Sequence, residues 1–463
     1  MASRLAPADF PAHRLTDPPL MAGIAAATGA LYALTAYALS PALLPVLLAA
    51  VLAIGIGLYR LEWGLALLLF VVPFSENAAI SDPGAARLRL ALVLWAMALV
   101  FVEGVRLVRS GEHIATPPLG RAAMAYLLAA LLAVPVAEHG GGAASKFLML
   151  AGSVTLFALV ALRIKDWRRL EIVIGATIVA GLVVSLHALY QHLTGNVSRI
   201  GFIDASGSVE YRVTSFFSHP NQLAGFLVVL IPVAAALSRH FAHRWLRIAA
   251  RLLIPLALAA VLVTYSRGAI VGLLALPLLF VRDPRTWPAL AAGLMVIALL
   301  SPGAWQDRIA GAGSLKSPEI ASRFDIWSAA VEAFQQRPFL GWGLDDFPSA
   351  YLALERPGRN FLGQGQFDLP PTAHNLYLNT AAEQGLVGLA ALAVLMIAIV
   401  RMTSRLGRAV DVRDRALGQA LLGVAIVLAL HNLFDLTFLE PKTSMLVWAL
   451  LGVGAARAGT AET

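Results

Sequence analysis

The chain has 463 residues, of which 59% are hydrophobic and only 13% are charged. Soluble domains carry about 25% charged residues, so this composition excludes an ordinary soluble protein and indicates a polytopic membrane protein. The absence of cysteine excludes disulfides and thiolate metal sites. The basic residues behind the net charge of +8 lie in short loops between apolar runs, which is typical of membrane orientation. We therefore expect membrane lipids around the chain and no nucleic-acid partner.

Apolar runs near the ~20 residues needed to cross a bilayer predict an all-α fold with about 12–14 transmembrane helices. A cleaved signal peptide has a short apolar region with a cleavage site soon after it. Here further apolar runs follow the first run at once, so the first run is interpreted as a span. The expected helices lie near residues 21–39, 41–58, 63–79, 88–105, 119–137, 146–163, 170–192, 220–238, 247–264, 267–281, 287–301, 375–401, 416–433 and 442–457.

Arginine and lysine in the connecting loops alternate from one loop to the next. Cytoplasmic loops are enriched in these residues, which places the basic loops and both termini in the cytoplasm. The opposite side then receives residues 72–85, 138–145, 193–219, the short turn "TYSRG", 302–373 and 434–441.

The longest outside segment, residues 302–373, is expected to be an ordered and mostly helical loop. Its stretch "SRFDIWSAAVEAFQQRPFLGWGLDDF" repeats apolar residues at helical spacing, at Ile326, Ala330, Val331 and Phe334. The following "RPFLGWG" ends that helix with proline and glycine. This segment is predicted to form a folded cap over the membrane part.

Four arginines are predicted to lie outside, where the charge bias disfavours them, so each is expected to have a structural or functional role: Arg199, Arg212, Arg267 and Arg323. Arg267, in "VLVTYSRGAIVGLL", has almost no loop around it. It either reaches the interface or an acidic partner, or points into a cavity and binds an anion such as phosphate.

Arg212 precedes a helix in "EYRVTSFFSHPNQLAG", with Ser218 as the expected cap and Pro220 at the first helical position. A helix N-terminus beside an arginine favours phosphate binding. The alternative is an ion pair with Glu210 in a solvated loop.

Polar residues also open the apolar run at 375–401, in "PPTAHNLYLNTAAEQG". In a helix starting near Thr372, Asn375, Asn379 and Glu383 share one stripe and are expected to hydrogen-bond to neighbouring helices. His374 lies on another face at the aqueous end, where an imidazole can act as general base near neutral pH, although a lone histidine is more often structural.

Two further polar pairs lie four residues apart, His187 with Gln191 and His431 with Asp435, and are expected mainly to satisfy each other. The chain contains no acidic metal-binding motif and no GxxxxGK[ST] nucleotide loop. We expect an activity without metal or other cofactor.

Four stretches occur in an order that resembles the bacterial O-antigen ligases and O-antigen polymerases. They cover parts of residues 195–440, where the resemblance is confined, and read "FFSHPNQLAGFL", "TYSRGAIVG", "RFDIWSAAVEAFQQRPFLGWG" and "HNLYLNTAAEQGLVG".

The resemblance implies a GT-C-like membrane glycosyltransferase in the bacterial inner membrane with its active site facing the periplasm. Its donor would be a glycan on undecaprenyl pyrophosphate, and its acceptor a hydroxyl of the lipid A core or of a growing glycan. His374 would be the catalytic base, and Arg212, Arg267 and Arg323 would bind the donor pyrophosphate. Supporting roles would fall to Asn221, Asn375, Glu383 and His431.

The resemblance also suggests a division of the chain. Residues 1–194 would be N-terminal transmembrane helices, 195–440 the catalytic region including the loop 302–373, and 441–463 the last helix and tail. A ligase is favoured over a polymerase of O-antigen or exopolysaccharide. A transporter is the rival from another class, but no repeat-related halves are evident.

Overall fold

The structure, a computed structural model, describes residues 55, 57, 59–75, 83–111, 116–138, 140–197, 200–203, 209–277, 318–354 and 372–460. The chain divides into two compact units, Met1–Gly64 and Leu65–Thr463, and the candidate site lies within the second. The spans expected at 21–39 and 287–301, most of that at 41–58, and Arg199 lie outside the described residues.

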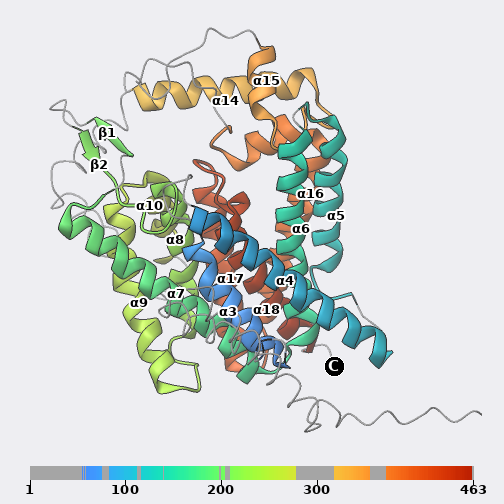
Figure 1. The fold of residues 1–463 in the computed structure, drawn as a ribbon, viewed down its shortest axis with the longest axis vertical. Coiled ribbons are helices and arrows are strands. Elements are labelled where there is room, and N and C mark those ends of the chain that lie inside the picture. Colours follow the sequence, from blue (N-terminus) through green and yellow to red (C-terminus); the bar gives the residue numbers. More distant parts are fainter. Residues whose placement is uncertain are drawn as a thin grey trace, which may run out of the picture. The chain divides into compact units, whose positions relative to one another are not determined.

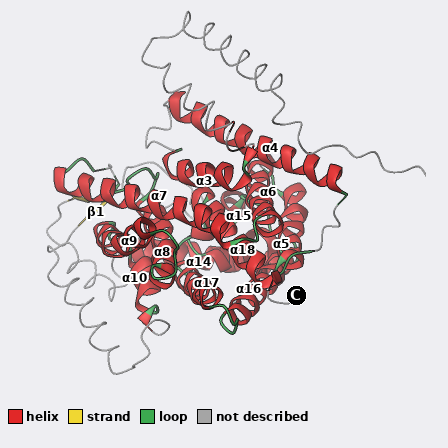
Figure 2. Ribbon diagram, turned by 90° about the horizontal axis from the view of Figure 1, so that it is seen from below, coloured by secondary structure: helices red, strands yellow, loops and turns green. Residues whose placement is uncertain are grey.

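Helices make up nearly all of the described part (Figures 1 and 2). They are α3 (Leu61–Val71), α4 (Pro83–Ser110), α5 (Gly120–Ala133), α6 (Gly140–Arg163), α7 (Trp167–Thr194), α8 (Pro220–Leu237), α9 (Arg244–Val263), α10 (Arg267–Leu274), α14 (Pro318–Gln336), α15 (Phe347–Ala353), α16 (Leu376–Leu406), α17 (Val412–His431) and α18 (Pro441–Thr460), with short 3₁₀ turns η3 (Val72–Phe74), η4 (Val134–Val136) and η6 (Thr437–Leu439).

Six of the described helices, α6, α7, α8, α9, α16 and α17, are long and apolar enough to cross a membrane. The chain is an all-α polytopic membrane protein, as its composition predicts. Helix α8 lies in the centre of its neighbours, with most of its side chains buried, and packs against α17 and α9. Small residues let the helices approach closely, as at Gly272 against Val427 and Gly452 against the backbone of Phe157.

Loops that the charge pattern assigns to the same side contact one another. Lys442 donates from Nζ to the carbonyl oxygens of Pro73 (3.1 Å) and Phe216 (2.7 Å), which both belong to predicted outside segments. At the basic end, Arg457 pairs with Asp414 at 2.8 Å. Lys442 thus joins two segments predicted to lie on one side, and Arg457 joins segments predicted to lie on the other.

The cap predicted within residues 302–373 is helical where it is described. Helices α14 and α15 lie across the end of the bundle at which α5 ends and α6 begins (Figure 1). The buried face of α14 carries Ile326, Ala329, Ala330 and Ala333, which pack around Trp342 and Phe347. Val331, which the helical spacing placed on the same face, is instead 43% exposed.

The cap is joined to α16 through a kink at Gly385, where φ is +61°. The amides of Trp342 and Gly343 donate to the carbonyls of Ala382 and Glu383 at 2.9 Å each. On the other side of the kink, the amide of Leu386 donates to Pro338 at 2.7 Å. The loop after α14 therefore satisfies backbone groups that the broken helix leaves open, which a span needs because lipid offers no partner.

Candidate functional site

Arg212 is positioned by a two-stranded ribbon. Strands β1 (Gly201–Ile203) and β2 (Val209–Tyr211) pair antiparallel, and the amide of Arg212 continues the pairing by donating to Ile200 at 2.9 Å. The side chain is 6% exposed; its Nε donates to the carbonyl of Thr264 at 2.7 Å and one terminal nitrogen to Oδ1 of Asn221 at 2.8 Å. Arg212 is therefore a fixed buried cation and not a residue of a solvated loop.

The helix that follows Arg212 is capped differently from the prediction. Pro220 is the first helical residue, as expected, but the N-cap is His219 and not Ser218. The Nδ1 of His219 accepts from the amide of Asn221 at 3.1 Å, and its carbonyl accepts from Gln222 and Leu223 at 3.0 and 3.3 Å. Since proline has no N–H, the first turn of α8 keeps no open amide for a phosphate, contrary to the expectation.

Arg323 approaches the site from the cap. It lies on α14, and its terminal nitrogen donates to the carbonyl of Phe434 at 2.6 Å. The ring of Trp327, one turn later, lies 6.5 Å from the ring of Phe434. The cap thus holds one of its arginines against the turn that follows α17.

His374 lies just before α16, in a backbone conformation that non-glycine residues rarely adopt, with φ at +48°. The amide of Ala373 donates to Oδ1 of Asn379 at 2.9 Å, which fixes the preceding residue. Asn375 caps α16 by accepting from Tyr377 and Leu378, and its Nδ2 donates to the carbonyl of Leu433 at 3.1 Å. The helix therefore begins at Leu376 and not near Thr372, because Asn375 is its cap. The positive φ of His374 is a strained conformation. Strain of this kind persists only where the surrounding structure holds it, and it is frequent at functional sites.

Asp435, in the turn after α17, links these segments electrostatically. Burial raises its pKa, but His431, His374 and His219, together with a hydrogen bond from the amide of Leu436, hold the pKa below its usual range. The pKa of His374 is lowered by burial and by Arg323, and Asp435 opposes that change. We call Arg212, His219, Arg323, His374, His431 and Asp435 the histidine–arginine cluster.

Three of the predicted site residues, Arg212, Arg323 and His374, are brought together in this cluster from separate parts of the chain. The pKa of His219 responds to all three of them as well as to Asp435. At neutral pH, the cluster offers two arginine cations, one carboxylate and an uncharged His374. That combination suits the binding of an anion beside a group that can accept a proton.

Arg267 is the first residue of α10, three residues after the carbonyl that holds Arg212. Its neighbour Gly268 packs against Phe434 and His431, where an added Cβ would lie 3.0 and 3.5 Å from them. The backbone of Arg267 thus borders the cluster.

Of the predicted supporting residues, three lie in or beside the histidine–arginine cluster and one lies elsewhere. Asn221 holds Arg212, Asn375 fixes the chain beside His374, and buried His431 contacts Oγ1 of Thr437 through Nδ1 at 2.7 Å. Glu383 instead accepts from the amide of Asp345 at 3.1 Å, which assigns it to the junction between the cap and α16. Among the described residues, Asn379 and Glu383 accept from loop backbone, where the prediction had them bonding to neighbouring helices.

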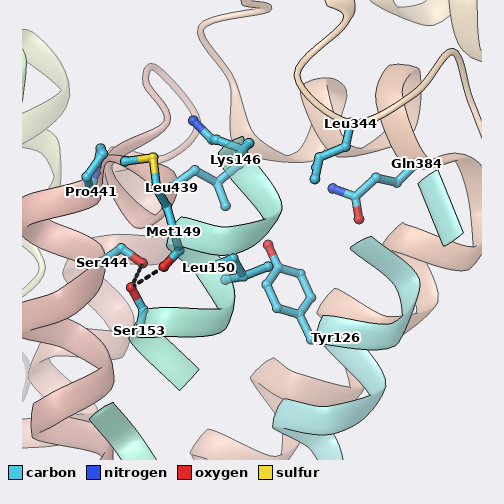
Figure 3. A pocket seen from close by; sticks show the side chains of 10 residues that line it. All are labelled: Tyr126, Lys146, Met149, Leu150, Ser153, Leu344, Gln384, Leu439, Pro441 and Ser444. Carbon is cyan, nitrogen blue, oxygen red and sulfur yellow. Dashed lines mark hydrogen bonds between the residues drawn. The ribbon is translucent and has the colours of Figure 1, made fainter. Parts of the chain in front are cut away.

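A small cavity with a mostly apolar lining and a few polar side chains lies beneath the cap (Figure 3). Tyr126 and Gln384 are fully buried beside it, and neither Oη of Tyr126 nor Oε1 of Gln384 has a hydrogen-bond partner among the described residues. Lys146, from α6, also lines the cavity and pairs with Asp345 at 3.7 Å. The volume at the centre of the cavity is about that of one water molecule.

Sequence reasoning missed His219 and gave Asp435 only a structural role. The signal for Asp435 was present, since a carboxylate directly after a predicted span, on the same predicted side as His374, is a candidate partner for that histidine. His219 was hidden by the neighbouring Ser218, because serine is the more common N-cap.

Residues 252–393 match the family model Wzy_C, described as O-antigen ligase. This stretch belongs to the O-antigen ligase family. The match confirms the resemblance inferred from the motifs and contains Arg267, Arg323 and His374, while Arg212 and Asp435 lie outside it. No curated protein matches the chain. Among the described residues, no three His, Asp or Glu side chains are arranged to hold a metal ion.

Proposed function

We propose that this O-antigen ligase-like protein is a glycosyltransferase that moves a glycan from undecaprenyl pyrophosphate to a hydroxyl of the lipid A core. It would act at the periplasmic face of the bacterial inner membrane, without a metal. The observation that carries the proposal is that Arg323 and Asn375, the residue after His374, donate to the adjacent carbonyls of Phe434 and Leu433, within a chain whose residues 252–393 match the ligase family.

His374 serves as the general base. The acceptor hydroxyl attacks the anomeric carbon, the bond from that carbon to the phosphate oxygen breaks, and the hydroxyl proton passes to His374. Because burial and Arg323 lower the pKa of His374, its ring is neutral at neutral pH and able to accept that proton. Asp435 stabilises the imidazolium that forms, since its carboxylate opposes the fall in that pKa.

The arginines stabilise the leaving group. Undecaprenyl pyrophosphate departs as an anion, and its developing charge is stabilised by cations already fixed in place. Arg212 is held by Thr264 and Asn221, and Arg323 by Phe434, so neither has to be ordered during the reaction. Arg267, on the border of the cluster, is the third proposed contact.

The test is the glycan profile of a strain that lacks this protein, rescued by wild type, His374→Ala or His243→Ala. His243 is exposed and lies before α9, in a predicted cytoplasmic loop, so its variant is a matched control. We expect long glycan to accumulate on undecaprenyl pyrophosphate without the protein and with His374→Ala, and to reach the lipid A core with His243→Ala. Single repeat units on the core without long chains would indicate a polymerase. Full rescue by His374→Ala would overturn the assignment of the base.

A further inference from the structure

His219 has only one ring nitrogen left for other partners. Its Nδ1 accepts the amide hydrogen of Asn221 at 3.1 Å, and an imidazole nitrogen that accepts carries no proton. In the neutral ring, the proton therefore sits on Nε2. This N–H points away from the first turn of α8, because Nδ1 faces that turn.

The surroundings of His219 keep the ring neutral. Burial lowers its pKa, Arg212, His374 and Arg323 lower it further, Asp435 opposes them, and the result is a pKa of about 4. A helix N-terminus also disfavours a cation at this position. His219 is thus an uncharged hydrogen-bond donor near pH 7, and at that pKa it is a poor proton acceptor.

The two histidines differ in whether their side chains cap the helix that follows. His219 caps a helix through its side chain, whereas the cap of α16 is Asn375 and leaves the ring of His374 without that task. Groups whose environments separate their protonation behaviour commonly divide the chemical roles of a site. His374 is the one that remains free of a capping duty and close to Asp435.

We propose that Nε2–H of His219 donates a hydrogen bond to a phosphate oxygen of the lipid pyrophosphate, beside Arg212 and Arg323. This rests on the proposed function, and it deepens that function by naming a donor contact that carries no charge. The arginines supply charge, and His219 supplies a directed donor at the point where α8 has no open amide of its own. A neutral donor also adds no cation next to His374, where a further positive charge would make proton acceptance harder.

Two substitutions separate capping from donation. His219→Asn keeps a good N-cap acceptor for Asn221 and removes Nε2–H. His219→Gln places an amide N–H near the position of Nε2 but is a poor cap. We expect His219→Asn to leave the melting temperature of the full chain in detergent unchanged and to weaken its binding of undecaprenyl pyrophosphate about tenfold. His219→Gln should melt lower and bind more tightly than His219→Asn.

Binding is measured with undecaprenyl pyrophosphate alone, so that the outcome does not depend on turnover. Binding by wild type and equal binding by His219→Asn would overturn the proposal and leave His219 as a cap only. If wild type itself fails to bind, the proposed function fails and this proposal falls with it. The pH profile of glycan transfer gives an independent readout: the acid limb should stay in place in His219→Asn, and loss of that limb together with the activity would make His219 the base.

Discussion

Nδ2 of Asn375 donates to the carbonyl oxygen of Leu433 at 3.1 Å, which ties the residue after His374 to the turn that contains Asp435. The amide of Leu376 adds a second link, to the carbonyl of Asn432 at 2.9 Å. The proposed base and the carboxylate that acts on its pKa are thereby held by the same backbone bonds. Neither of these two links involves the cap helices α14 and α15.

Replacing Asp435 by Asn should change both the rate of glycan transfer and its pH dependence. Asp435 raises the pKa of His374, so its loss lowers that pKa further and moves the acid limb of the pH–rate profile to lower pH. The weaker base should reduce the rate about tenfold or more near pH 7. The measurement is the pH profile of transfer by purified protein. Asp411→Asn, which keeps the cap of α17, is the control, and an unmoved limb in Asp435→Asn would contradict the pairing.

Replacing Arg212 by Lys should weaken donor binding although the charge is kept. The guanidinium uses two nitrogens, for Thr264 and for Asn221, and a single ammonium cannot reproduce that geometry. We expect the KM for lipid-linked glycan to rise about tenfold, equivalent to roughly 1.4 kcal/mol. Arg408→Lys, on the exposed basic end, should leave KM unchanged. A normal KM in Arg212→Lys would remove Arg212 from the donor site.

Replacing Gly341 or Gly385 by Ala should destabilise the protein. Both have φ above +60°, and an added Cβ would lie 2.4 Å from Glu383 or Phe339 backbone atoms. The positive φ alone costs an alanine roughly 1–3 kcal/mol, and the clash adds to it. Gly152→Ala, with nothing within 4 Å of the new Cβ, should instead stabilise α6 by up to about 1 kcal/mol. The melting temperatures of the three variants are compared in detergent. Unchanged melting temperatures of Gly341→Ala and Gly385→Ala would show that the contact between the cap and α16 does not stabilise the protein.

Replacing Tyr126 by Phe tests whether the cavity beneath the cap holds water. A water that bridges Tyr126 and Gln384 would make the tyrosine hydroxyl stabilising, and its removal should lower the free energy of unfolding by about 1 kcal/mol. A dry cavity would give the opposite sign, because the substitution would then remove an unsatisfied polar group. The sign of the change in melting temperature decides between them, with the exposed Tyr190→Phe as control.

The sequence by itself determined the membrane fold and most helix positions, since a run of apolar residues long enough to cross a bilayer has few other stable structures. It also predicts that the basic loops share one side, and it selected Arg212, Arg267, Arg323 and His374 as candidate site residues. Those predictions needed only composition, local pattern and the resemblance carried by four short motifs.

Only the tertiary structure decided how these residues meet. The N-cap of α8 could not be predicted because Ser218 and His219 are both able to cap, and packing selects between them. Glu383 and Asn379 share a helix face, yet one bonds to the cap and the other to Ala373. Asp435 acts on histidines that lie 4, 61 and 216 residues earlier in the chain. Electrostatic coupling depends on distance in space and on burial, and neither quantity can be predicted from the local sequence.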